Sequence, residues 1–223
     1  MWKRFQRAAG RLRTLGPREV ARRAAAHAER VAWERYFGVD TSHFVFDVEW
    51  HAEHRHYEPL PWPLVRRAVS ALAPQAHDVF LDYGAGLGRL MLMAGRQRLE
   101  RVLGVELMPL LAERARDNLR QAASRLRSPV EVFNTDATTW SVPDDVSLVT
   151  FFNPFVGTVM AAVQAQLRAS LERRPRPLRL VYAHADDQPD LFASCDWVRF
   201  GRRLDVGVFS GMNLALYEHA GPT

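Results

Sequence analysis

A glycine-rich turn that follows a short apolar run is the segment of this sequence best suited to chemistry. Residues 78 to 89 read DVFLDYGAGLGR, in which Asp82 is followed by Gly84, Gly86 and Gly88. Glycines let the backbone approach a ligand closely, and the free N–H groups at a helix start favour an anionic group. The next residues, LMLMAG, are apolar enough for a helix packed on a sheet. The pattern predicts a nucleotide-type cofactor site between a strand and that helix, although a tight turn without a ligand would use the same glycines.

The spacing of the glycines separates two classes of cofactor. A dinucleotide fingerprint, G-x-G-x-x-G, would place its third glycine at position 89, which is Arg89. The string found here, with Asp82 two residues before the first glycine, resembles the first motif, D-x-G-x-G-x-G, of class I S-adenosylmethionine-dependent methyltransferases. That resemblance implies that Asp82 lies near the ammonium group of S-adenosyl-L-methionine. The residues around the methionine end of the cofactor would be Gly84, Ala85, Gly86 and Gly88.

Two further acids stand at the ends of predicted strands. RVLGVE, residues 101 to 106, reads as a second buried strand, and a carboxylate at its tip can accept hydrogen bonds from two ribose hydroxyls. Glu106, with Leu107 beside it, therefore indicates an adenosine-containing cofactor, although dinucleotide enzymes use the same device. VEVFNTDA predicts a third strand that ends before Asp136 and Ala137. The resemblance implies that Asp136 binds the adenine amino group, and an aspartate that caps the next turn is the open alternative.

The candidate catalytic residues follow the fourth and fifth predicted strands. Residues 146 to 152 end in Asn153-Pro154-Phe155, and active sites of open α/β sheets lie at the carboxyl ends of the strands. The motif resembles the D/N/S-P-P-Y/F signature of methyltransferases that act on amino groups, without its second proline. The resemblance implies that Asn153 and a backbone carbonyl accept the hydrogens of an amine. After LRLVYAHA, His184 is the candidate general base for an oxygen nucleophile, because imidazole titrates near neutrality.

A wider resemblance covers residues 36 to 185. The segments FGVDTS, YEP, FLDYGAGLGR, GVE and FFNPF, in that order, look like a little-characterised bacterial group of methyltransferases. That group is distantly related to histone-lysine methyltransferases of the telomeric-silencing type, which also carry an asparagine at this strand end. The resemblance specifies the cofactor better than the methyl acceptor, which could be a protein, an RNA or a small metabolite.

Residues 36 to 61 lack helical or strand periodicity and precede the first strand. We expect an ordered loop that covers the cofactor, with Asp40, Thr41 and Tyr57 lining the site. The loop also holds residue types that ligate zinc or iron, namely His51, Glu53, His54, His56 and Glu58. Their spacing fits no i, i+4 pair on a helix, so we expect solvated or hydrogen-bonded side chains and no metal.

The positive charge of the protein is concentrated in an amino-terminal arm. Residues 1 to 35 hold ten basic and three acidic side chains, a net charge of +7, so the remaining residues carry about −2 of the total +5. Periodicity predicts two amphipathic helices, from Trp2 to Leu15 and from Val20 to about Trp33. We favour an arm that packs on the domain or on a second subunit, and anionic membrane or nucleic acid are the alternatives. Three glutamates in the arm argue against a cleaved targeting peptide.

Length and composition set the remaining expectations. The chain has 223 residues and one cysteine, which excludes an internal disulfide framework and fits a cytoplasmic protein. No apolar run approaches the roughly 18 residues of a membrane-spanning helix.

We expect a basic helical arm and flap over residues 1 to 60 and an S-adenosylmethionine-binding domain over 61 to 223. That domain would be a Rossmann-like α/β fold, with a seven-stranded, mostly parallel sheet and an antiparallel carboxyl-terminal hairpin. An S-adenosylmethionine-dependent methyltransferase is the expected function, with S-adenosyl-L-homocysteine as product. An NAD-dependent oxidoreductase and a non-catalytic cofactor-binding or membrane-associated module are the alternatives.

Overall fold

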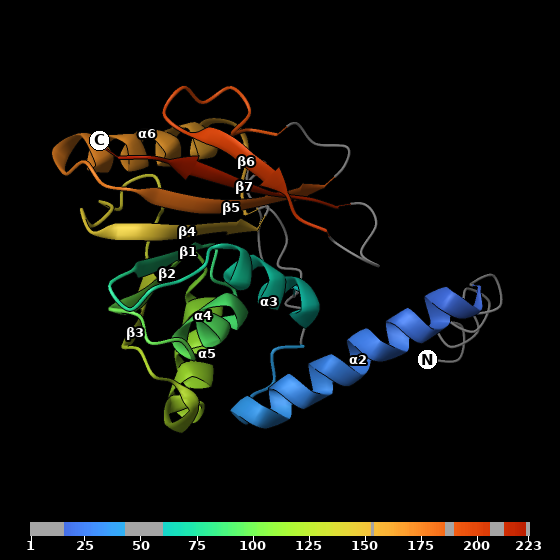
Figure 1. The fold of residues 1–223 in the computed structure, drawn as a ribbon. Coiled ribbons are helices and arrows are strands. Elements are labelled where there is room, and N and C mark those ends of the chain that lie inside the picture. Colours follow the sequence, from blue (N-terminus) through green and yellow to red (C-terminus); the bar gives the residue numbers. More distant parts are fainter. Residues whose placement is uncertain (1–15, 43–59, 153, 186–189, 206–211, 222–223) are drawn as a thin grey trace.

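A seven-stranded sheet with helices on both faces forms the body of the protein (Figure 1). The computed structural model describes residues 16–42, 60–152, 154–185, 190–205 and 212–221. The strands are β1 Val79–Tyr83, β2 Arg101–Glu106, β3 Val130–Asn134, β4 Val146–Phe152, β5 Leu178–Ala185, β6 Arg199–Arg203 and β7 Met212–His219. The helices are α2 Pro17–Phe37, α3 Trp62–Ala71, α4 Arg89–Gly95, α5 Pro109–Gln121 and α6 Gly157–Arg173, with a 3-10 turn at Ala123–Arg125.

The strand order confirms the predicted fold class. The sheet runs β3-β2-β1-β4-β5-β7-β6, and the neighbours from β3 to β5 are parallel. β7 lies antiparallel between β5 and β6, which closes the sheet with the expected hairpin. The chain moves outward from β1 to β3 and then crosses back to β4 on the other side of β1. This reversal places the topological switch point at the carboxyl ends of β1 and β4, the position at which open α/β sheets have their ligand-binding crevice.

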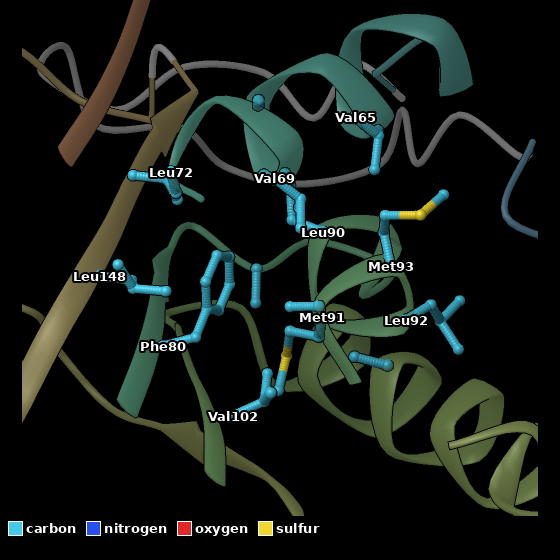
Figure 2. Close-up of a cluster of buried hydrophobic side chains, with 14 of the residues drawn as sticks. Val65, Val69, Leu72, Phe80, Leu90, Met91, Leu92, Met93, Val102 and Leu148 are labelled. Atoms are coloured by element: carbon cyan, nitrogen blue, oxygen red, sulfur yellow. The ribbon is translucent and has the colours of Figure 1, made fainter. Parts of the chain in front are cut away.

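The sheet separates two apolar cores. Figure 1 shows α3, α4 and α5 on one face and α6 on the other. Because side chains of a strand alternate between faces, Phe80 packs with the first group of helices while Leu81 belongs to the core beneath α6. Figure 2 shows the first core, in which side chains of α3 and α4 surround Phe80, Val102 and Leu148. This packing fixes the height of α4 above the sheet and thereby places the turn that precedes it.

A glycine in β2 permits that close packing. A Cβ added at Gly104 would collide with the sulfur of Met91 and approach the Ala85 Cβ to 3.0 Å. The glycine in RVLGVE is therefore needed because α4 and its preceding turn lie directly on this strand.

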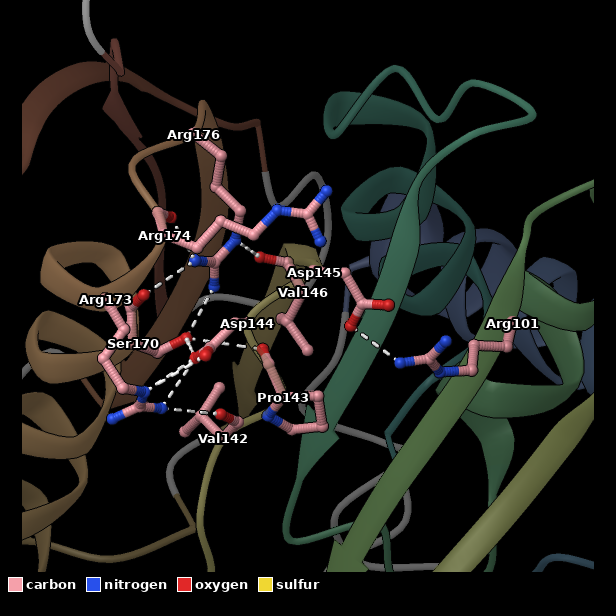
Figure 3. Close-up of polar contacts among 10 residues, drawn as sticks. All are labelled: Arg101, Val142, Pro143, Asp144, Asp145, Val146, Ser170, Arg173, Arg174 and Arg176. Carbon is pink, nitrogen blue, oxygen red and sulfur yellow. Dashed lines mark hydrogen bonds and ion pairs between the residues drawn. The ribbon is translucent and has the colours of Figure 1, made fainter.

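A polar network at the amino ends of the strands lies opposite that crevice (Figure 3). The Asp144 carboxylate accepts hydrogen bonds from Arg173 at 2.7 Å and Ser170 at 3.1 Å, and the Arg173 bond contributes most to lowering its pKa. Arg101 donates to Asp145 at 2.7 Å, which links β2 to the start of β4. These contacts join loops to helix α6 and carry no ligand chemistry.

The last turns of α2 pack on the domain. Trp33 and Phe37 stack on Trp62 of α3, with ring centroids 6.0 and 5.7 Å away, and Phe37 is buried in the first core. The predicted second helix is thus present and ends at Phe37, four residues beyond the predicted end. The first predicted helix lies outside the described residues. The domain boundary at residue 60 stays a prediction. In the described part of the chain, no helix combines the length and apolarity needed to cross a membrane.

Candidate functional site

The glycine turn between β1 and α4 is held against β2. Gly84, Gly86 and Gly88 have φ angles of 73°, 54° and 85°, in the region that favours glycine. The N–H groups of Gly84 and Ala85 both donate to the Val105 carbonyl, at 2.9 and 3.1 Å. The three glycines are therefore required by the backbone path of this turn.

The exit of β4 lies directly on the first glycine of the turn. A Cβ added at Gly84 would stand 2.6 Å from the Cβ of Pro154 and would force one of the two segments to move. The structure thus brings together two motifs that are 70 positions apart in the sequence.

Glu106 links the end of β2 to the glycine turn. One carboxylate oxygen accepts the Gly86 N–H at 2.8 Å, and the other accepts the Met108 N–H at 3.0 Å. Burial raises the pKa of Glu106, and the backbone N–H groups of Met108 and Gly86 partly oppose that rise. Glu106 is 6% exposed, so its charge has little contact with water.

Asp82 is a second buried carboxyl on the same face of the sheet. It is 2% exposed and accepts a hydrogen bond from the Thr150 hydroxyl at 2.7 Å. Burial raises its pKa well above the usual value, the Thr150 bond opposes this, and the nearby charge of Glu106 adds to it. Two carboxyls thus line the carboxyl ends of β1 and β2, and neither forms an ion pair with a residue in the described ranges. Sequence reasoning did not single out Thr150, which stands inside an apolar strand.

The Asp136 side chain caps the turn that follows β3, which was the alternative to a role in adenine binding. One of its carboxylate oxygens accepts the N–H and the hydroxyl of Thr138, at 2.8 and 2.7 Å. Asp136 is exposed and Ala137 is buried, and Leu107 is 36% exposed beyond Glu106. A contact of these three residues with adenine stays a prediction.

Thr41 is fully buried and holds the end of α2 to the start of α4. Its hydroxyl donates to Glu34 at 3.0 Å and accepts from Arg89 at 2.7 Å. Arg89 also donates to the carbonyls of Thr41 and Leu60 and to the Glu34 carboxylate. Sequence reasoning placed Thr41 in the cofactor site, which stays a prediction, and treated Arg89 only as a missing glycine. Tyr57 lies outside the described residues.

The predicted catalytic motif is described only in part. Asn153 lies outside the described residues, and Pro154 is half-buried against the glycine turn. Phe155 is 5% exposed and meets Tyr83 and Phe151 edge to face, with both centroid distances 6.2 Å. The Phe155 ring is therefore part of the core beneath α6, and it supports the β4 exit by packing.

His184 is buried near the end of β5. Its ring stacks on Tyr182 at 5.1 Å and its Nε2 lies 3.9 Å from a carboxylate oxygen of Asp190. The same oxygen accepts the Tyr217 hydroxyl at 2.6 Å. These contacts orient the imidazole, while its role as a base stays a prediction.

In the described ranges, no group of three or more histidine, cysteine or acidic side chains is arranged to hold a metal. The histidine-rich segment with His51, His54 and His56 lies outside those ranges.

No family model and no curated protein matches the sequence. Solved structures with the same architecture do match. One is an RNA methyltransferase from Salinibacter ruber in complex with S-adenosyl-L-homocysteine, 23% identical, with a TM-score of 0.52 over 74% of this chain and 96% of that chain. A magnesium protoporphyrin IX methyltransferase from Synechocystis PCC 6803 with bound SAM is 13% identical, with a TM-score of 0.54 over 71% and 79% of the two chains.

The chain has a class I methyltransferase fold. A precorrin 8w decarboxylase from Methanobacterium thermoautotrophicum also matches, at 16% identity and a TM-score of 0.53 over 74% of this chain and 92% of that one. At such low sequence identity, these matches establish only the fold. A proposal about the reaction must therefore rest on the residues of the site. The resemblance to enzymes of the telomeric-silencing type stays a prediction.

Proposed function

We propose that the protein is an S-adenosylmethionine-dependent methyltransferase. The observation that carries the proposal is the pair of buried carboxyls, Asp82 and Glu106, beside a glycine turn at the switch point of the sheet. Burial raises the pKa of both groups, so a ligand that supplies an ammonium and two hydroxyl groups would stabilise their charged forms. The amino acid and ribose parts of S-adenosyl-L-methionine carry those groups. Neighbours of the same fold that contain S-adenosyl-L-homocysteine or SAM support this choice.

Each motif then has a role toward the cofactor. Asp82 would lie at the ammonium group, Glu106 would accept the ribose hydroxyls, and Asp136 would accept from the adenine amino group. The turn from Gly84 to Gly88 would surround the methionine end, and Leu107 and Ala137 would flank the adenine. We also propose that three residues outside the glycine turn and the ends of β1 to β3 contact the cofactor: Thr41, Tyr57 and Asn153.

The bound cofactor supplies a methyl group on a positively charged sulfur, a centre already activated for transfer. The work left to the chain is alignment of the nucleophile, which can contribute about 7 to 11 kcal/mol. The proposal extends to a nitrogen nucleophile, whose hydrogens Asn153 and the Pro154 carbonyl would accept. His184 would take the proton of an oxygen nucleophile instead.

The alternatives are less well supported by the same residues. An NAD-dependent oxidoreductase would share Glu106, but the third glycine stands one residue early for its fingerprint and Arg89 occupies the expected position. The antiparallel β7 is also typical of a methyltransferase sheet and is not needed by a dehydrogenase. A membrane-associated module would leave the two buried carboxyls without a use, whereas a non-catalytic cofactor-binding module would use them and differs only by the absence of methyl transfer.

Thermal unfolding with S-adenosyl-L-homocysteine tests the proposal. Ligand at 100 times its dissociation constant adds about 2.7 kcal/mol to the free energy of unfolding, so the melting temperature should rise. Gly84→Ala should remove this rise, because the added methyl group would collide with Pro154. Gly38→Ala is the matched control, since Gly38 has a φ of 72°, close to the 73° of Gly84, and a Cβ added there would have no atom within 4 Å.

Both variants share the strain of a positive φ, so only the collision at the site distinguishes them. Gly38→Ala should therefore keep the full ligand-induced rise. A folded wild-type protein whose melting temperature responds to NADH and ignores S-adenosyl-L-homocysteine would overturn the proposal in favour of the oxidoreductase.

A further inference from the structure

An open groove lies between helix α3 and the edge strand β6, on the face of the sheet that carries α3, α4 and α5. It has a volume of about 320 Å³. The groove is lined by Arg66, Arg67, Ser70, Ala71, Arg202, Leu204 and Asp205. Its three guanidinium groups come from two segments that are distant in sequence and are joined only by the fold.

The charges in the groove are poorly compensated. Arg67 contacts Asp205 at 3.6 Å, but the Asp205 side chain is 83% exposed, so water screens that pair. The Arg66 side chain is 52% exposed and uses only its Nε on Glu29, at 3.3 Å. Arg202 is exposed, and its side chain makes no hydrogen bond or ion pair to any residue in the described ranges. The groove is thus a cluster of three arginines on a domain, residues 61 to 223, whose net charge is only +2.

Helix α2 lies beside one wall of the groove. The contact between Arg66 and Glu29 joins α3 to α2, and α3 lies between α2 and the sheet (Figure 1). Arg35 on α2 is exposed, and residues 1 to 35 carry a net charge of +7. A basic surface that spans two elements and stays open to water suits an extended polyanion better than a single small anion, which an enclosed pocket would surround.

We infer that this groove binds the phosphodiester backbone of a single-stranded nucleic acid. A guanidinium presents a planar fork of donors that matches two phosphate oxygens, and the Ser70 hydroxyl adds a donor to the same groove. The lining contains no aromatic side chain for base stacking, so the contacts position the strand without reading its sequence. That the bound strand is also the methyl acceptor rests on the proposed function.

Fluorescence anisotropy of a fluorescein-labelled single-stranded RNA, titrated with the full chain at several salt concentrations, tests the inference. Each phosphate contact on a single strand contributes about −0.7 to the slope of log K against log salt. The double variant Arg66→Gln/Arg202→Gln should therefore bind more weakly, with a slope shallower by about 1.4.

The matched control is the double variant Arg127→Gln/Arg174→Gln, which changes the net charge by the same amount. Both arginines are exposed and precede β3 and β5, at the amino ends of the strands, where Figure 3 shows Arg174. This control should have nearly the affinity and the salt slope of the wild type, because the loss of two distant positive charges has only a small effect.

The outcomes separate the inference from its rivals. Unchanged affinity and slope in the folded groove variant, or an equal loss in the control variant, would overturn it. Full competition by inorganic pyrophosphate at the same phosphate concentration would also overturn it, since a small anion would then suffice. The rise in melting temperature with S-adenosyl-L-homocysteine should persist in the groove variant, so failure of the cofactor proposal is detected separately.

Discussion

Asp82 and Glu106 dominate the electrostatics of the site. Each carboxyl is nearly inaccessible to water, and the partners found for them in the described part of the chain are a hydroxyl and backbone N–H groups. Removing two neighbouring carboxylates from water without a cation costs free energy, which is why burial raises both pKa values. The ligand-free protein is therefore less stable than it would be with neutral groups at these positions.

We expect Asp82→Asn to change how stability depends on pH. A carboxyl whose pKa is raised in the folded state binds more protons there than in the unfolded chain. Its stabilising contribution is present below the unfolded value of 3.8 and is lost as the pH rises through the raised value. Within that window the wild type should lose up to about 1.4 kcal/mol per pH unit relative to the variant. Urea unfolding of both proteins across the acidic to neutral range measures this difference.

Asn keeps an oxygen that can accept the Thr150 hydroxyl, so the variant retains that hydrogen bond. If the two unfolding free energies run parallel over the whole pH range, the charge of Asp82 is not destabilising in the folded protein. Thr150→Val should make stability depend more strongly on pH than in the wild type, because it removes the hydrogen bond that opposes the rise in the Asp82 pKa.

Among the elements, α2 and α4 are joined by one buried guanidinium. Arg89 is the first residue of α4 and directly follows the glycine turn, and it is 6% exposed. It contacts Glu34 at 3.2 Å near the end of α2 and the Thr41 carbonyl at 2.9 Å. Its guanidinium also lies 5.4 Å from the ring centroid of Trp62. The end of α2 and the start of α4 are therefore coupled.

Arg89→Met should destabilise the protein by about 3 to 5 kcal/mol, the range for breaking a buried ion pair by removal of one partner. Arg98→Met is the control on the neighbouring segment, and because Arg98 is exposed it should change stability by no more than about 0.5 kcal/mol. In a double-mutant cycle, Glu34→Gln should cost less in the Arg89→Met background than in the wild type. Additive losses would show that the pair contributes no coupling.

The elements themselves were largely predictable from the sequence. β4 and β5 match the apolar runs at 146 to 152 and 178 to 185, because strands covered on both faces are continuous apolar segments. The turn at residues 191 to 194 has no signature in the local sequence pattern. There the Asp190 carboxylate accepts the Phe192 N–H at 3.1 Å and Phe192 is buried beneath α6, so tertiary packing decides the local backbone.

Only those parts of the site that are formed by residues close together in the sequence were predictable. The glycine turn and the strand-end acids carry spacing that a single sequence reveals. The partners of Arg89 lie 29 to 55 residues away along the chain, and the approach of Pro154 to Gly84 depends on the order of strands in the sheet. Contacts of this kind have no signature in local periodicity. The basic groove escaped notice for the same reason, because net charge averages its arginines with distant acids.

At the scale of the whole molecule, α2 has two parts with different energetics. The described side chains from Val20 to Ala28 are almost all exposed, whereas Phe37 is 2% exposed and covers Trp62. Burial of large apolar side chains is the dominant source of stability, so only the second part should contribute substantially to folding.

Two truncations measure that division. Deletion of residues 1 to 28 should change the free energy of unfolding by no more than about 0.5 kcal/mol, because the described side chains that it removes, from Val20 to Ala28, are almost all exposed, and it keeps the Glu29 contact with Arg66. Deletion of residues 1 to 42 should cost at least about 3 kcal/mol, since it uncovers Trp62 and removes Glu34 and Thr41 from Arg89. Equal losses from both deletions would mean that α2 acts as one unit. The shorter deletion should also weaken RNA binding while it preserves the response to S-adenosyl-L-homocysteine, because residues 1 to 28 carry a net charge of +7 and the glycine turn is left intact.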